Sequence, residues 1–106
     1  MFVAKAEVKT PKASVYLVQL CKHFAHKVHA TYDDSHGTVR FKPGVCIMRA
    51  DRDVLSLHCE ADSEHALATV KATVGDHLVR FAWREELPSV EWVTCASADT
   101  RTIPVA

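Results

Sequence analysis

The first nine residues alternate between apolar and polar side chains with a period of two. This period is typical of a β-strand with one buried face. The alternation therefore predicts a strand at the start of the chain, with the inward positions Phe2, Ala4, Ala6 and Val8.

A three- and four-residue spacing of apolar side chains follows and predicts an amphipathic helix over residues 11–27. Thr10 stands before Pro11, which suits an N-cap followed by a proline in the first turn, where its missing N–H costs nothing. The buried stripe of this helix is expected to be Ala13, Leu17, Leu20, Cys21, Phe24 and Val28.

Two-residue alternation resumes after the helix and predicts a hairpin. Residues 34–37 supply turn chemistry, and a four-residue loop there would place Tyr32 opposite Val39 and Ala30 opposite Phe41. Pro43 and Gly44 then interrupt the pattern, and the inward positions change from odd to even numbers. We expect either a bulge or corner at this point, or the start of an extra strand.

A second hairpin can be tested by arithmetic. A two-residue loop at Arg52 and Asp53 makes the numbers of facing residues add up to about 105. The predicted pairs on one face are Ala50 with Leu55, Met48 with Leu57 and Cys46 with Cys59, and on the other Ile47 with His58 and Val45 with Glu60.

Ser63 marks the start of a last long helix, which Pro88 would end. The order β-α-β-β-β-α, with a possible extra strand at Pro43-Gly44, predicts an α+β fold. Its simplest form is a two-layer sandwich in which both helices cover one face of an antiparallel sheet. We expect one domain over residues 1–92 and a poorly ordered tail over residues 93–106, because that stretch shows no period.

Composition narrows the choice of function. The chain has 106 residues with 13 basic and 13 acidic side chains, and this balance argues against nucleic acid as a partner. No apolar run is long enough to span a membrane and no leader pattern begins the chain, which predicts a cytoplasmic protein. The four cysteines form no Cys-x-x-Cys pair, so in a reducing compartment they are expected to be buried apolar groups.

The first helix carries two histidines three residues apart, His23 and His26, so both rings can reach one ligand. Tyr16 lies on the same flank as His23. A simpler interpretation is that these histidines pack at the edge of the helix and bond to water. Both interpretations are consistent with the spacing.

The second helix has a comparable flank, formed by His77, Arg80 and Arg84. The two flanks lie on the same rotational side of the buried stripes of their helices. If the two helices run antiparallel, either both flanks face the groove between the helices or both face away from it. In the first case six side chains would line a cationic slot suited to an anionic or catechol-like molecule. The alternative is that Arg80 and Arg84 pair within their own helix, for example with Asp76.

Other candidate chemistry is weaker. Asp33, Asp34 and His36 could bind a divalent cation, although such residues are also typical of turns. The common catalytic signatures, such as a phosphate-binding glycine loop or a His-Glu-x-x-His helix, are absent.

Three segments resemble an uncharacterised bacterial family, the domain of unknown function 2218. They are residues 19–27, residues 34–37 together with Phe41 and Gly44, and residues 76–87. The resemblance implies no established activity. Similar domains occur beside siderophore-interacting, flavin-dependent ferric reductases, which implies an accessory role in iron handling with a siderophore-handling flavoprotein as a partner.

The sequence therefore predicts a small binding or accessory module, more readily than an enzyme, that takes an anionic small molecule or an iron chelate. The predicted ligand-binding residues are Tyr16, His23, His26, His77, Arg80 and Arg84. One alternative is a metal-dependent enzyme that uses His23, His26 and His77 as ligands. The other is a structural domain that dimerises through its sheet.

Overall fold

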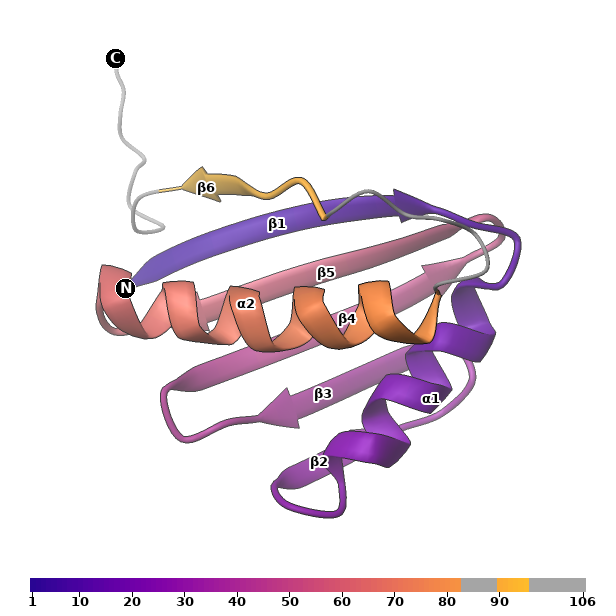
Figure 1. Ribbon diagram of the computed structural model, residues 1–106, viewed down its shortest axis with the longest axis horizontal. Coiled ribbons are helices and arrows are strands. Elements are labelled where there is room, and N and C mark those ends of the chain that lie inside the picture. Colours follow the sequence, from indigo (N-terminus) through magenta and orange to yellow (C-terminus); the bar gives the residue numbers. More distant parts are fainter. Residues whose placement is uncertain (83–89, 96–106) are drawn as a thin grey trace.

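The computed structural model describes residues 1–82 and 90–95. Its elements are β1 (Phe2–Lys9), α1 (Ala13–Phe24), β2 (His29–Tyr32), β3 (His36–Arg40), β4 (Gly44–Asp51), β5 (Val54–Ala61), α2 (Glu64–Phe81) and β6 (Val93–Cys95). They form a six-stranded antiparallel sheet in the order β2-β3-β4-β5-β1-β6. Both helices lie on one face of it (Figure 1). The predicted two-layer α+β architecture is confirmed.

The two helices cover different parts of the sheet. Helix α1 packs on β2, β3, β4 and β5, whereas α2 packs on β4, β5 and β1. The inward side chains of the strands, among them Ala4, Val39, Met48 and Leu57, meet the helix stripes in one buried core. No helix among the described residues is long and apolar enough to cross a membrane.

The hairpin of β4 and β5 has the predicted register. Cys46 faces Cys59 and Met48 faces Leu57, and every other predicted pair of this hairpin is also present. The inward side chains Cys46, Met48, Leu55, Leu57 and Cys59 are buried in the core, and Ala50 is half-buried. A short loop and a clear alternation were enough to determine this part of the sheet.

The hairpin of β2 and β3 differs from the prediction by two residues. Tyr32 faces Gly37 and Ala30 faces Val39. The loop is shorter than expected because the Asp33 carboxylate accepts hydrogen bonds from the backbone N–H groups of Ser35 and His36, each at 2.8 Å. These bonds close the turn and also hold the pKa of Asp33 below its usual value. They favour the interpretation of these residues as a turn.

The change of inward positions at Pro43 comes from a turn between two separate strands. Phe41 and Gly44 exchange backbone hydrogen bonds, so the chain reverses here and Val39 comes to face Cys46. No bulge is needed, since a two-residue turn pairs odd with even positions. A Cβ atom at Gly44 would lie 2.3 Å from the carbonyl oxygen of Glu60, which explains why glycine stands there.

The ends of the elements show further differences. Helix α1 begins at Ala13, with Lys12 as its N-cap residue, and Thr10 instead accepts a hydrogen bond from the Lys12 N–H at 3.1 Å. Ser63 caps α2 as predicted, by accepting from Ala66 N–H at 3.0 Å. The sequence did not predict β6, which pairs with β1. The rest of the predicted tail, residues 96–106, lies outside the described residues.

Candidate functional site: a histidine pocket between the helices

His23 and His77 lie side by side, although they come from different helices. His23 is in the last turn of α1 and His77 is one turn before the end of α2. Their ring centroids are 4.9 Å apart and the ring planes are tilted by 43°. His23 is exposed and His77 is half-buried, so the pair is open to solvent on one side.

Phenylalanines surround the pair. The ring of Phe24 lies 5.0 Å from that of His77 and 5.0 Å from that of Phe41, which follows β3. Phe81 packs its ring edge against His23 at 5.6 Å. Edge contacts of this kind hold aromatic rings in fixed orientations. The two imidazoles therefore have apolar neighbours on several sides.

A cavity of about 400 Å³ opens beside the pair. We call it the histidine pocket; its lining is His23, Phe24, His26, Lys27, Val28, Phe41, Thr73 and His77. Phe24 is buried, Val28 and Phe41 are half-buried, and His26 and Lys27 are exposed. An apolar floor thus lies beside a polar, basic rim, which is the usual make-up of a small-molecule site.

A backbone hydrogen bond orients His77. Its Nδ1 atom lies 2.7 Å from the carbonyl oxygen of Thr73, one turn earlier in α2. Since a carbonyl oxygen only accepts, Nδ1 carries the hydrogen. In the neutral ring, Nε2 then holds a lone pair and points away from the backbone of α2. The ring presents to its surroundings the nitrogen that can gain a proton or accept a hydrogen bond.

Positive groups collect around His23. The pKa of His23 lies below its usual value, because the protein removes part of the ring's hydration and because His77, His26, Lys27 and Arg80 disfavour its charged form. Among the described residues, no Asp or Glu lines the pocket. An anion would therefore meet attraction here without a competing carboxylate.

The structure brings only part of the predicted site together. His23, His26 and His77 all line the histidine pocket. Tyr16, two helical turns before His23, is 5% exposed and belongs to the hydrophobic core. Arg80 acts on His23 through its charge but does not line the pocket. Arg84 lies outside the described residues.

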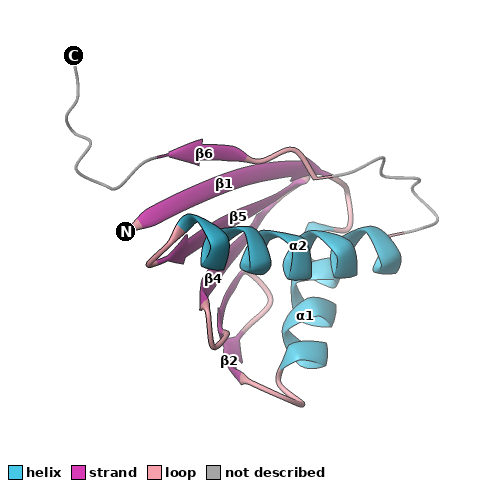
Figure 2. Cartoon of the chain, turned by 60° about the vertical axis from the view of Figure 1, so that its left-hand side comes forward, coloured by secondary structure: helices cyan, strands magenta, loops and turns pink. Residues whose placement is uncertain are grey.

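The expected antiparallel arrangement of the helices is wrong. Figures 1 and 2 both show α1 crossing α2 steeply instead of lying alongside it. Two crossing helices share a short contact, whereas parallel flanks would form a long slot. The crossing explains why one histidine from each helix meets while Tyr16 remains in the core.

The predicted three-histidine metal site is not assembled. Among the described residues, no three His, Cys, Asp or Glu side chains are grouped so that they could hold one metal ion. His26 shares the pocket with the pair but does not complete a ligand set with it. A catalytic zinc site normally needs three protein ligands.

Sequence reasoning missed several pocket residues. Lys27 and Thr73 carried no signal of their own, since one is an exposed base and the other a half-buried helical threonine. Phe24 and Val28 were expected only as core residues. Phe41 reaches the pocket from the turn at Pro43, where the sequence left a bulge, a corner and an extra strand open.

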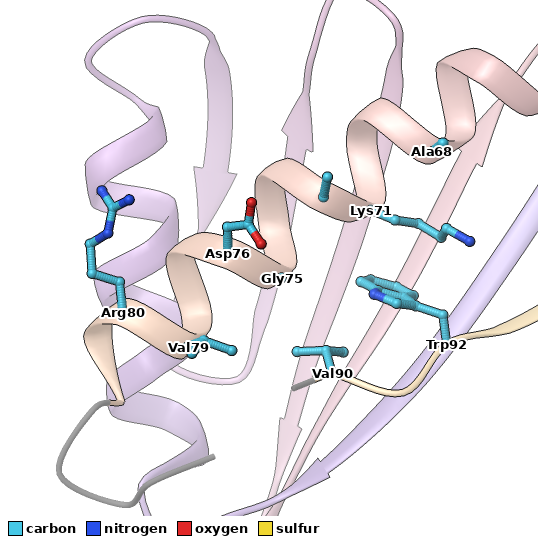
Figure 3. Close-up of a pocket in the computed structure, with 9 residues that line it drawn as sticks. Ala68, Lys71, Gly75, Asp76, Val79, Arg80, Val90 and Trp92 are labelled. Atoms are coloured by element: carbon cyan, nitrogen blue, oxygen red, sulfur yellow. The ribbon is translucent and has the colours of Figure 1, made fainter. Parts of the chain in front are cut away.

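A second cavity of about 620 Å³ lies on another side of α2 (Figure 3). Trp92 and Val90 form one wall, and Gly75, Lys71 and Asp76 of α2 form the other. Figure 3 shows the Arg80 side chain pointing away from Trp92. Residues 83–89, between Ala82 and Val90, lie outside the described residues.

Comparison with known proteins places the chain in a family. A family described as "uncharacterized protein conserved in bacteria", the domain of unknown function 2218, matches residues 5–93, and the chain belongs to it. The NMR structure of PA4090 from Pseudomonas aeruginosa is similar, with a TM-score of 0.73 and 29% sequence identity over 90% of this chain and 96% of that one. No curated protein matches the chain.

Proposed function

We propose that the protein is a small binding module of the cytoplasm that takes an anionic molecule with an apolar body in the histidine pocket. The observation that carries this proposal is the pairing of two imidazoles from different helices above an aromatic floor. Neither ring is needed to fill the core, since His23 is exposed and His77 half-buried.

Charge selects the kind of ligand. Within residues 1–82 and 90–95, the titratable side chains that line the pocket are three histidines and Lys27, and Arg80 adds a positive charge nearby. A carboxylate can accept hydrogen bonds from imidazole and ammonium groups, and charge-assisted bonds of this kind are stronger than neutral ones. The negative group of the ligand is therefore expected at the rim, between the histidine pair and Lys27.

Shape and polarity select the rest of the ligand. The floor formed by Phe24, Phe41 and Val28 offers an apolar surface, and a volume of about 400 Å³ lies within the range of small-molecule pockets. An aromatic or branched aliphatic carboxylate fits both parts. A catecholate also combines a negatively charged group with an aromatic body. The proposal therefore includes an iron chelate as a ligand and a siderophore-handling flavoprotein as a partner.

The test is a titration followed by NMR, with benzoate, 2,3-dihydroxybenzoate, its ferric complex and inorganic phosphate as separate probes. Benzoate is expected to shift the amide signals of residues 23–28, Phe41, Thr73 and His77. Binding of the ferric complex alone would favour the iron-handling version over the carboxylate version. Absence of shifts at these residues with every probe would contradict the proposal.

Two variants sharpen the test. His77→Phe keeps an aromatic ring but removes the ring nitrogens, and it should weaken benzoate binding at least about tenfold, since loss of one charge-assisted bond is worth about 1.5–3 kcal/mol. His65→Gln removes an exposed histidine of α2 that does not line the pocket, and it should leave binding unchanged. Equal effects of the two variants would contradict the assigned site.

A further inference from the structure

We infer that the histidine pocket binds the ionised form of a carboxylic acid and takes up one proton from solvent as it does so. The His23–His77 pair holds this proton. The inference rests on the proposed function and deepens it. It assigns a ligand class, weak organic acids with apolar bodies, and a coupling between binding and pH.

In the empty pocket, the geometry opposes a positive charge on both rings at once. Two imidazole rings with centroids 4.9 Å apart repel each other when both are charged. In the described part of the chain, the charged and titratable groups around His23 are His77 and Arg80 from α2, and His26 and Lys27 after α1. All of them are basic, so each one opposes the gain of a further positive charge.

A bound anion favours a positive charge on the histidine pair. A carboxylate placed at the rim attracts a positive charge, so the pair gains a proton from solvent as the ligand enters. The balance is one carboxylate and one H⁺ taken up for each complex formed, with no bond made or broken in the ligand. Binding and protonation are then linked, and each strengthens the other.

The hydrogen bond to Thr73 identifies the nitrogen atom of His77 that can gain a proton. Nδ1 already donates to the carbonyl oxygen at 2.7 Å, so only Nε2 is available to gain a proton. A protonated Nε2 can donate to the carboxylate while Nδ1 keeps its bond to the helix. The ring does not have to rotate or change its tautomer when the ligand enters.

The linkage predicts how the affinity for the carboxylate changes with pH. When the empty pair is neutral, the proton must come from solvent, so affinity falls as the pH rises, by up to about tenfold for each pH unit. When the empty pair already carries the proton, the dependence disappears. An uncharged analogue such as benzamide gains nothing from the proton and should bind without this dependence.

The experiment is isothermal titration of the full chain with benzoate at pH 7.5, in Tris and in triethanolamine, cationic buffers with different ionisation enthalpies. The apparent binding enthalpy should differ between the buffers, corresponding to the uptake of at least about half a proton per benzoate. His77→Gln and His23→Gln should each reduce this uptake, and His65→Gln should retain it.

The outcomes separate the two claims. Benzoate binding with no proton uptake would overturn the inference and leave the proposed function in place. Absence of benzoate binding would overturn both for this ligand class. A long-range ¹H–¹⁵N spectrum of the imidazoles gives an independent check, since a hydrogen on Nε2 instead of Nδ1 of His77 in the neutral, ligand-free protein would also overturn the inference.

Discussion

The Cys46–Cys59 pair and the His23–His77 pair differ in their access to water. Cys46 and Cys59 face each other across β4 and β5, and both are fully buried. His23 and His77 meet where the helices cross, beside an open cavity. The hydrogen bond that the Cys46 thiol donates to Cys59, together with burial, raises the pKa of Cys46, whereas loss of hydration and nearby positive groups lower the pKa of His23.

The comparison separates packing from chemistry. A buried thiol with a raised pKa is a small apolar group and is inert as a nucleophile. Cys21, which lies in the same core, follows this rule, because burial raises its pKa to about 11. A pair of imidazoles beside a cavity can exchange protons and bind ligands. Access to solvent, more than the identity of the pair, decides which one can function.

The largest expected effect is on the core around the cysteines. Leu57 is 2% exposed and faces Met48, so Leu57→Ala should lower the free energy of unfolding by about 2–5 kcal/mol through the cavity it leaves. Urea unfolding measures the change. The control Ile47→Thr, on the open face where Ile47 is 42% exposed, should change stability by about 0.5 kcal/mol or less.

A second substitution tests the apolar character of the cysteine pair. Cys46→Ser places a hydroxyl group in a fully buried site and should destabilise the protein by about 1–3 kcal/mol. Cys46→Ala should cost no more than Cys46→Ser, although alanine is the smaller residue. A serine variant clearly more stable than the alanine variant would contradict the view that this pair is apolar packing.

The histidine pair should contribute less to stability. A double-mutant cycle of His23→Ala and His77→Ala at pH 8 should give a coupling energy of about 0.5–1.5 kcal/mol, the range for an aromatic pair. The coupling should fall on acidification, because a gain of positive charge on His23 is opposed by the basic groups around it. A coupling that grows on acidification would contradict the arrangement of positive groups around His23.

The smallest effect concerns pH and stability. The pKa of His23 is lower in the folded than in the unfolded protein, so the unfolded state binds more protons in the range below about pH 6.5. The His23 contribution is therefore present at pH 7 and above and is lost as the pH falls toward 5. Thermal unfolding should show a shallower pH dependence in His23→Gln than in the parent chain.

The same two pairs show which contacts could be predicted from the sequence and which could not. The Cys46–Cys59 contact depended on one short loop and a two-residue period, and local arithmetic was enough. The His23–His77 contact depended on the angle at which α1 crosses α2, which no local pattern specifies. The flanks pointed to His23, His26 and His77, which line one pocket in the structure, but the crossing angle put Tyr16 in the core and replaced an arginine-lined slot with a pocket floored by Phe24 and Phe41.

The central claim is that the His23–His77 pair and its aromatic floor form one binding site for a carboxylate. The most direct test is a set of intermolecular nuclear Overhauser effects between benzoate and the protein. The account predicts contacts from the benzoate ring to the rings of Phe24 and Phe41 and to those of the two histidines. Contacts to Trp92 and Val90 without any to Phe24 or Phe41 would contradict it.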